Sequence, residues 1–496
     1  MRNSTMLVPA LALALAGCAS SPAYRAPAVE VPPAFREAKS DTGLVSDTGL
    51  VVAPPPTVPP AVPPAGPPAA AAGDSAGLTR FWRPLSDTTL DRLMTELLRA
   101  NLDVRAAQAR LRGARAARLE SAFDLAPTVT VGGGYTRQRL SNATFPIGAG
   151  SFPDQDIWDA GFDASWELDL FGRVRRGVQA QGALVGAAGE SVRDVQVALT
   201  AQLARSYFEL RGAQDQLAVA RRNAQNQRST LELTQQRLDA GRGTAFDTER
   251  ARAQLSFTLA SIPDLEARVA SAQYQIGVLV GRPPAALAGE LDSVVALPAL
   301  PATVTLASPD SLVRRRPDVA AAERQLAAEH AFVGVAKADY LPRITVGGSA
   351  GYSASALGSL GDDGTFRYSV GPVLSWPALN LGRVKARVDE SRAREAEAQA
   401  RYTQTVLLAL QEVETGLVRY RTARVRVARI QEAAEASARA AELARLRFTG
   451  GVADFLQVLD AERTQLEAEE QLAQSRTDAA TAYAALYQAL GGGTLD

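Results

Sequence analysis

The sequence predicts an α+β membrane protein built from two tandem copies of one unit, in which two strands are followed by two long helices. Three observations predict this fold class. The stretch WELDLFGRV (Trp166 to Val174) returns 210 residues later as WPALNLGRV (Trp376 to Val384). The residues before each motif alternate between apolar and polar side chains. The residues after each motif repeat apolar side chains every seven positions.

The composition excludes several classes of function. The 496 residues carry a formal net charge of zero, so nothing favours nucleic acid as a partner. Cys18 and His330 are the only cysteine and histidine in the sequence, which argues against a zinc cluster, a Cys/His nucleophile or a structural disulfide. We find no nucleophile elbow either, and therefore expect a protein without metal or cofactor that is not an enzyme. After the N-terminus no apolar stretch is long enough for a transmembrane helix.

The N-terminus has the features of a targeting segment. Arg2 is followed by the apolar run MLVPALALALAG, which ends in LAGC, Leu15 to Cys18. This ending resembles the lipobox of bacterial lipoproteins, in which the cysteine is lipidated after cleavage and becomes the mature N-terminus. An ordinary secretory signal with an incidental cysteine is the alternative. Ala19, in the place where such lipoproteins often carry an inner-membrane retention aspartate, favours the outer membrane.

The next sixty residues have low complexity. SDTGLV occurs twice in tandem, as Ser40 to Val45 and Ser46 to Val51, and a proline run follows from Ala53 to Pro68. Proline-rich chain favours extended polyproline II conformations and builds no core. We therefore expect a flexible tether, although a PxxP partner-binding role is an alternative.

Each copy of the repeat contains two strand candidates. Trp158 to Leu168 places Trp, Ala, Phe and Leu at even positions and Asp, Gly, Ser and Glu at odd ones, and Phe366 to Trp376 repeats the alternation. Their partners, Thr128 to Tyr135 and Ile344 to Tyr352, are richer in glycine. A half-buried sheet in a soluble domain would also alternate, but aromatic residues near the strand ends suit a membrane barrel. Pro372 would require a bulge or an unpaired position.

Four strands are too few to close a barrel, and open strand edges are not tolerated in lipid. If these strands span a membrane, the chain must therefore oligomerise.

Long helices are predicted for the rest of each copy. No proline occurs between Pro153 and Pro263 or after Pro377, and a helix from about residue 174 to 240 would be roughly 100 Å long. The heptad seams comprise Leu203, Leu210, Leu217, Ala224, Leu231 and Leu238, and, 210 residues on, Val413, Tyr420, Val427, Ala434, Ala441 and Phe448. Glycines end both long helices, at 241 and 243 and at 450 and 451, and a second helix returns from each. A generic coiled coil would explain the heptads but not the strands.

Three motifs carry a family resemblance that extends from about Phe81 to Gly493. They are SWELDLFGRV, RRRPDVAAAERQLAAEHAFVGVAKADYLPRITVGGSAG and RFTGGVADFLQVLDAERTQL. By these motifs the chain resembles the outer-membrane factors of the TolC/OprM type, the exit ducts of tripartite efflux pumps. The resemblance implies a homotrimer with a 12-stranded barrel in outer-membrane lipid and a 12-helix α-barrel crossing the periplasm. The implied partners are a periplasmic adaptor (membrane fusion protein) and an inner-membrane transporter of the RND type.

This resemblance, together with the patterns above, divides the chain as follows: signal peptide 1–17; lipid anchor and Pro-rich tether 18–78; N-terminal helices 79–126; first β-hairpin 127–169; first long helical pair 170–281; linker 282–315; helix of the second repeat 316–341; second β-hairpin 342–377; second long helical pair 378–490; C-terminal tail 491–496.

The resemblance also implies where the functional residues lie. In the OprM-like members a hydrophobic ring and an Asp–Arg arrangement close the periplasmic aperture, and the matching positions are Leu456, Asp460 and Arg463. Gln457 replaces the further aspartate of TolC-like members, so a cation-binding ring would be weaker here. From the residues alone, an ordinary i,i+3 surface pair explains Asp460 and Arg463 equally well. The remaining expected sites are the helix tips for adaptor contact, Gly241, Gly243, Thr244, Gly450 and Gly451, and the strand-to-helix junctions, Trp166, Gly172, Trp376 and Gly382.

Two other features have structural explanations. His330 lacks a second ligand nearby in sequence, so a packed or solvated histidine is expected. The basic stretch from Arg314 to Asp318 could bind an anion, but Pro317 and Asp318 favour a helix start.

The exported substrate is not encoded in these patterns. A type I secretion duct, a metal-ion efflux duct and a structural coiled-coil lipoprotein tether remain alternatives to drug efflux.

Overall fold

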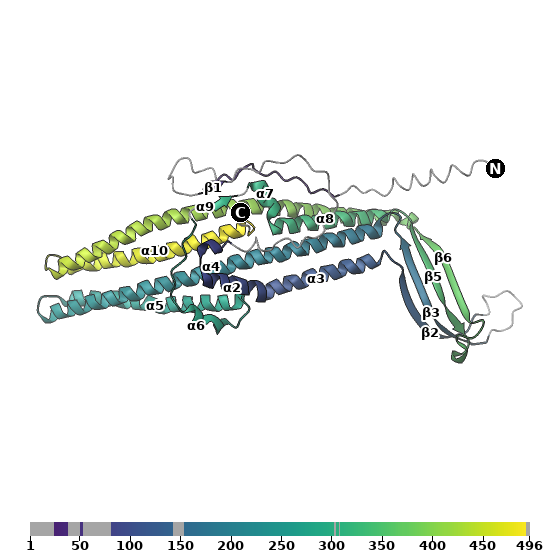
Figure 1. The fold of residues 1–496 in the computed structure, drawn as a ribbon, viewed down its shortest axis with the longest axis horizontal. Helices are drawn as coiled ribbons and strands as arrows, with labels where there is room; N and C mark the ends of the chain where they lie inside the picture. Colours follow the sequence, from purple (N-terminus) through teal and green to yellow (C-terminus); the bar gives the residue numbers. More distant parts are fainter. Residues whose placement is uncertain are drawn as a thin grey trace. The chain divides into compact units, whose positions relative to one another are not determined.

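The computed structural model describes residues 24–37, 50–52, 81–141, 153–301, 304–306 and 308–492 (Figure 1). The chain forms two compact units. The sheet unit comprises Met1–Ala28, Ala109–Gly189 and Ala321–Thr403, and the helical unit comprises Val29–Gln108, Glu190–Ala320 and Gln404–Asp496. Within the described ranges, no helix is long and apolar enough to cross a membrane.

Four antiparallel strands form the sheet of the first unit. They are β2 (Thr128–Gln138), β3 (Gln155–Leu168), β5 (Arg343–Ala354) and β6 (Phe366–Ser375), in the order β2-β3-β5-β6. Pairing is continuous along the central strands β3 and β5, from Trp158 opposite Ala354 to Leu168 opposite Ile344. The two hairpins of the repeat therefore join into one sheet, and β2 and β6 are its edges.

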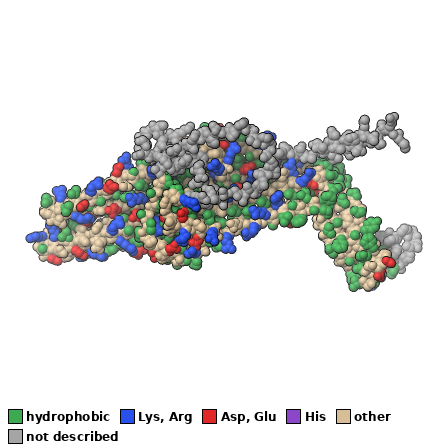
Figure 2. All heavy atoms as spheres, in the orientation of Figure 1, with side chains coloured by type: hydrophobic (Ala, Val, Ile, Leu, Met, Phe, Trp, Pro, Cys, Tyr) green, Lys and Arg blue, Asp and Glu red, His purple; other side chains and the backbone are tan. Residues whose placement is uncertain are grey.

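The register gives the sheet one apolar and one polar face. Tyr135 lies opposite Trp158, and their rings pack with centroids 4.5 Å apart. Because side chains alternate along a strand, four further apolar residues share this face, and all four are exposed in the protomer: Val131, Phe162, Tyr368 and Val370. Figure 2 shows hydrophobic side chains gathered over the strands.

Charged side chains gather on the opposite face, where Arg367 of β6 lies 3.2 Å from the carboxylate of Asp159 on β3. This polar face suits a water-filled interior, and the apolar face suits lipid.

Pro372 takes the second of the two expected solutions, a position without a ladder hydrogen bond, and there is no bulge. It lies opposite Val346 in unbroken register on the edge strand β6. The N–H of Ser353 donates to the carbonyl of Thr365 at 2.9 Å, which makes this a hydrogen-bonded pair. Hydrogen-bonded and non-hydrogen-bonded pairs alternate in an antiparallel ladder, so Val346 and Pro372 form a non-hydrogen-bonded pair. The proline nitrogen therefore points away from β5 to the open edge, where the β5–β6 ladder needs no donor.

Two very long helices and two shorter ones follow the strands. α4 (Arg173–Asp239) and α9 (Leu381–Thr449) have 67 and 69 residues, about 100 Å each. α5 (Ala245–Leu279) and α10 (Phe455–Ala489) return from them, and α5 continues through Pro263. The predicted heptad seams are largely buried: Leu203, Leu210, Val413 and Ala441 are fully covered, and Leu231, Leu238 and Val427 partly.

The core of the helical unit lies where short helices pack on these long ones. α2 (Thr88–Ala100) contributes Leu90, Leu93, Met94 and Leu97, all fully buried. α6 (Ala288–Leu291) and α7 (Pro309–Arg315) also belong to this unit, whereas most of α3 (Leu102–Phe123) and of α8 (Pro317–Ala338) belongs to the sheet unit. Asp87 caps α2 through the N–H of Leu90 and also accepts a hydrogen bond from the Tyr207 hydroxyl at 2.6 Å. Burial and then this carboxylate raise the pKa of Tyr207 to about 12.

A buried arginine marks the start of α8, where Pro317 takes the first helical position as expected. Arg316 is 6% exposed and pairs with Asp318 at 2.8 Å and Glu412 at 2.7 Å. It also donates to the carbonyl of Ala489, at the end of α10, at 2.6 Å. Two carboxylates already neutralise its charge, so Arg316 holds helices together and offers no anion site.

The expectation of a flexible tether over 18–78 is wrong for two stretches. Phe35 is 2% exposed in the core, because this aromatic side chain lies before the proline run and has apolar surface to bury. Leu50–Val52 forms strand β1, which pairs in parallel with β4 (Val304–Leu306). The stretch from 282 to 315, expected as a linker, likewise contains α6, β4 and α7.

Candidate functional site

The two helical pairs end in turns of the same geometry, 210 residues apart. Gly241 and Gly451 have φ of +70° and +73°, in the left-handed region that favours glycine. In both turns the residue after this glycine donates its N–H to a carbonyl five residues back: Arg242 to Arg237 at 2.8 Å and Val452 to Arg447 at 2.9 Å. This is the Schellman arrangement, which satisfies a free carbonyl at each helix end.

The other expected tip residues have different roles. Thr244 caps α5 by accepting a hydrogen bond from the N–H of Asp247 at 3.2 Å. A Cβ on Gly243 would lie 3.1 Å from the backbone nitrogen of Leu238, so a side chain there is crowded. Gly450 has no positive φ, and a Cβ there would make only ordinary contacts. Only one glycine of the 450–451 pair is therefore required by the turn.

An apolar cluster underlies the tips. Phe448 of α9 and Phe455 of α10 pack with ring centroids 5.6 Å apart, together with Val458 and with Ala251 of α5. The guanidinium of Arg237, from α4, lies 4.1 Å from the centroid of the Phe448 ring. All four long helices are thus tied together at this end of the protomer.

The three expected aperture residues share one solvent-exposed face of α10 in the protomer. Asp460 and Arg463 form an ion pair at 3.0 Å, and Arg463 also lies 3.9 Å from Glu467. Positions 456, 460 and 463 fall on one helical face. Leu456 is 48% exposed on that face. The structure brings these side chains together on a surface that the protomer itself does not cover.

Glu462, a neighbour of this pair, was missed by the sequence analysis. Its side chain is 3% exposed and accepts hydrogen bonds from Arg445 of α9 at 2.7 Å and from Thr230 of α4 at 3.0 Å. One carboxylate oxygen has no partner within the described residues. The spacing 455, 458, 462, 466 of the buried face of α10 was the signal that could have placed this acid inside.

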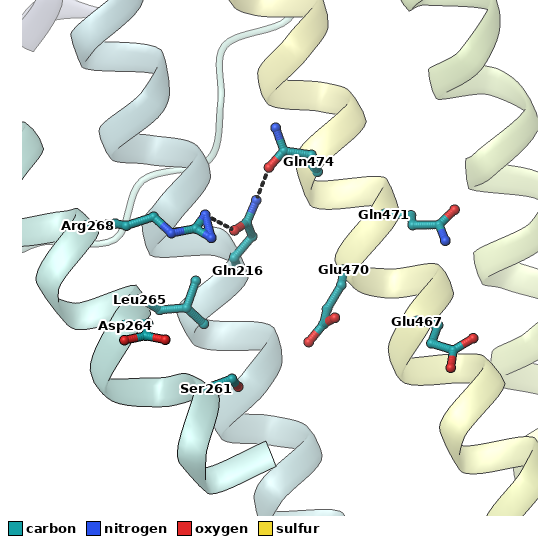
Figure 3. Close-up of a pocket in the computed structure, with 9 residues that line it drawn as sticks. All are labelled: Gln216, Ser261, Asp264, Leu265, Arg268, Glu467, Glu470, Gln471 and Gln474. Atoms are coloured by element: carbon teal, nitrogen blue, oxygen red, sulfur yellow. Dashed lines mark hydrogen bonds between the residues drawn. The ribbon is translucent and has the colours of Figure 1, made fainter. Parts of the chain in front are cut away.

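Further along the helices from the tips, a polar cavity of about 400 Å³ lies between α4, α5 and α10 (Figure 3). Gln216 bridges the three helices, donating to Gln474 at 2.8 Å and accepting from Arg268 at 3.3 Å. Burial, and then the nearby Glu467, raise the pKa of Glu470 on the opposite wall. The amides and charges in this cavity offer hydrogen bonds but no nucleophile activated by a base.

At the strand-to-helix junctions the two tryptophans act alike. The indole N–H of Trp166 donates to the carbonyl of Leu125, and that of Trp376 donates to the carbonyl of Tyr340, both at 3.0 Å. The acceptors are 215 residues apart, so the contact belongs to the repeat. Each tryptophan thus ties a strand end to the chain that leaves the preceding helix.

The junction glycines differ from each other. Gly172 has φ of +79° immediately before α4, whereas Gly382 is the second residue of α9 and has no positive φ. The second copy enters its helix two residues earlier in the repeat, so glycine is required by the backbone only at the first junction.

His330 and Cys18 complete the expected sites. His330 pairs through Nδ1 with Glu395 at 2.7 Å, and its ring lies 5.7 Å from that of Tyr24. In the part of the chain that the structure describes, no group of His, Cys, Asp and Glu side chains could hold a metal ion. Cys18 lies outside the described residues.

Comparison with known proteins gives consistent matches over most of the chain. A family model described as "Outer membrane efflux protein" matches residues 93–282 and 308–492. The pyoverdine export outer membrane protein OpmQ of Pseudomonas aeruginosa is 30% identical over 433 residues, 85% of this chain and 90% of that protein. Outer membrane protein OprJ of the same organism is 32% identical over 335 residues, 66% of this chain and 68% of that protein. The structure of the outer-membrane channel OprN superposes with a TM-score of 0.83 at 36% identity, covering 96% of this chain and 99% of that one.

Proposed function

Because the chain belongs to the outer membrane efflux protein family, we propose that it is the passive exit duct of a tripartite pump that exports small organic compounds. It has the TolC-type channel fold, with long helices and four antiparallel strands per protomer, and it is an outer membrane channel rather than an enzyme. The pump partners proposed for it are a periplasmic adaptor and an inner-membrane transporter of the RND type.

The sheet is the observation that carries the proposal. One face is apolar and exposed, the other bears Asp159, Asp163 and Arg367, and both edge strands lack a neighbour among the described strands. A sheet with these faces is suited to lipid outside and water inside. Pairing β6 of one protomer with β2 of the next would remove the open edges, and three protomers would give twelve strands.

The closed end of the duct is proposed to lie at the helix tips. In a symmetric trimer, each of Leu456, Asp460 and Arg463 recurs three times around the axis. Three exposed Leu456 side chains could then form a dry constriction, and Arg463, 3.0 Å from Asp460, would relieve the repulsion between the carboxylates. The turns at Gly241, Gly243 and Thr244 and at Gly450 and Gly451 are the proposed surface for the adaptor.

The substrate class and the lipid anchor complete the proposal. The name of OpmQ assigns that relative to export of pyoverdine, a small organic molecule, and a duct of this fold adds no chemistry of its own. We therefore place drugs and other small toxic compounds before secreted proteins or metal ions. Lipidation of Cys18 would hold the mature N-terminus at the inner leaflet of the outer membrane.

Bilayer conductance and complementation test this function together. Purified protein in planar bilayers should give discrete conductance steps, and its gene should restore resistance to small organic toxicants in a strain that lacks its own outer membrane duct but keeps the cognate transporter and adaptor. A structural coiled-coil tether would give neither result. Restored metal tolerance or protein secretion without organic-compound resistance would refute the substrate class but keep the duct.

A further inference from the structure

Within one protomer, the second half of the first repeat packs against the first half of the second repeat. Strand β3 pairs with β5, and their neighbours in sequence are α4, which follows β3, and α8, which precedes β5. The two helices are in contact, because a Cβ on Gly334 of α8 would lie 3.3 Å from Cδ of Arg176 on α4. In the proposed trimer, β6 of one protomer meets β2 of the next, so α9 should contact α3 of the next protomer in the same way.

The repeat determines which residues face each other at that second contact. α9 corresponds to α4 with an offset of 210 residues, and α3 corresponds to α8 with an offset of 215. Arg176 therefore corresponds to Ala386, and Gly334 corresponds to Leu119. The large and the small residue have exchanged sides, and Leu119 is 58% exposed in the protomer, where a neighbour can cover it.

Opposite charges lie near each other at the contact inside the protomer. Arg173, at the start of α4, pairs with Glu167 at 2.6 Å. The hydrogen bond with Glu167 raises the pKa of Arg173 most, burial opposes the rise, and the charge of Asp339, directly after α8, adds to it. Asp339 has partners of its own, Arg343 and, at 3.6 Å, Arg387. The attraction across this contact thus acts between groups that are already paired.

The counterpart of Arg173 at the second contact has lost its partner. Arg383 of α9 occupies the place of Arg173, but Pro377 stands where the first copy has Glu167. Arg383 is exposed and forms no ion pair with a residue that the structure describes. A guanidinium stays protonated in a protein, so Arg383 keeps its charge and is available to a carboxylate.

The counterpart of Asp339 has lost its partners too. Asp124, directly after α3, occupies the place of Asp339, but Thr128 and Gly177 stand where the second copy has its two arginines. Asp124 is exposed, and among the described residues it forms no ion pair either. The protomer therefore leaves one cation and one carboxylate unpaired at the two positions that the trimer brings together.

From these correspondences, and on the premise of the proposed trimer, we propose that Arg383 of each protomer forms an ion pair with Asp124 of the next. The three pairs lie where the barrel strands give way to the helices, and Leu119 covers Ala386 beside each of them. They attach the helices of neighbouring protomers at the level where the hydrogen bonds of the sheet end.

A charge-reversal cycle in the full-length protein tests the pair. Arg383→Asp and Asp124→Arg should each lower the temperature at which the detergent-solubilised trimer dissociates, because each places like charges at the contact. The double variant restores opposite charges and should recover most of the loss. The matched control combines Asp124→Arg with Arg392→Asp, an exposed residue about two and a half turns along α9 and hence on its opposite face. It carries the same charges and should show no recovery.

Losses that simply add in the double variant, or equal recovery in the control, would overturn the ion pair while leaving the trimer in place. A wild-type protein that is monomeric in native mass spectrometry would instead refute the proposed duct, so the two failures are distinguishable. If a reversal prevents assembly, Arg383→Gln and Asp124→Asn give the same cycle, and their double variant should lose no more than either single variant.

Disulfide trapping provides a second measurement of the same contact. In a Cys18→Ser background, Leu119→Cys with Ala386→Cys should give covalent dimers and trimers on a non-reducing denaturing gel, because a disulfide needs Cα atoms within about 7 Å. Leu119→Cys with Arg392→Cys is the control and should remain uncross-linked. Cross-linking within one chain, or none in assembled trimers, would contradict the contact between protomers.

Discussion

Removing the proposed constriction at the helix tips should open the channel at rest. The perturbation is the double variant Leu456→Ala and Asp460→Ala, which shortens the apolar ring and breaks the Asp460–Arg463 pair. Asp460 is exposed and Leu456 is 48% exposed, and neither lies on the buried face of α10 formed by Phe455, Val458, Glu462 and Leu466, so the substitutions leave that face intact. Trimer assembly should therefore be unaffected.

The size of the effect follows from the exposure of Leu456. Leu456 leaves 48% of its surface exposed, and covering that half around the axis contributes about 1 kcal/mol per protomer and about 3 kcal/mol per trimer. The Asp460–Arg463 pair, at 3.0 Å, lies within one helix and forms in the open and closed states alike, so it adds nothing to this difference. The total of about 3 kcal/mol corresponds to roughly a hundredfold shift of the closed-to-open ratio.

Single-channel recording in planar bilayers measures this shift as open probability, and vancomycin sensitivity measures it in cells. Phe246→Ala with Glu249→Ala is the matched control. It removes an exposed apolar side chain and the acid of an i,i+3 pair, Glu249–Arg252 at 2.7 Å, from α5 instead of α10. The control should keep wild-type conductance. Wild-type conductance in a well-assembled Leu456 and Asp460 variant would show that this face is an ordinary helix surface.

Three further predictions concern anchoring, packing and pH. Mass spectrometry of the mature N-terminal peptide should find Cys18 lipidated, and Cys18→Ser should remain in the membrane if it is exported; an unmodified Cys18 or another cleavage site would refute the anchor. Gly212→Ala should destabilise by about 1–3 kcal/mol, because its Cβ would lie 1.9 Å from Oγ1 of Thr477 on α10, and Thr477→Ala should partly restore the temperature of trimer dissociation. Burial raises the pKa of Asp194 above its ordinary value of 3.8. The charged carboxylate therefore lowers the stability of the folded protein at pH values above this raised pKa, and the loss disappears as the pH falls through it and the group is protonated. Asp194→Asn should therefore raise the dissociation temperature at neutral pH, with a gain that shrinks on approach to pH 4; a gain that grows on acidification would contradict this sign.

The strands and long helices could be predicted because their signals are local. A period of two over β3 and β6 and a heptad seam over α4 and α9 depend only on which residues follow one another. The 210-residue offset of the repeat also predicts that the two tips correspond, and Gly241 and Gly451 adopt the same left-handed turn.

The rest depends on contacts between distant parts of the chain. Phe35 lies within the stretch 18–78 that was expected to be a flexible tether, and only the core shows that its ring is covered. Glu462 is one acid among many on a charged helix, and its burial follows from the positions of Thr230 and Arg445. Gly382 matches Gly172 in the motif, yet α9 begins before it, so equal sequence did not ensure equal backbone.

Native mass spectrometry of the full-length protein, extracted from outer membranes in mild detergent, tests the central claim most directly. The four-stranded sheet is apolar on one face, and neither edge strand has a further neighbour among the residues that the structure describes, so it can line a duct only when several chains share it. The account predicts three copies per particle, with lipid bound. A stable, folded monomer in lipid would contradict it.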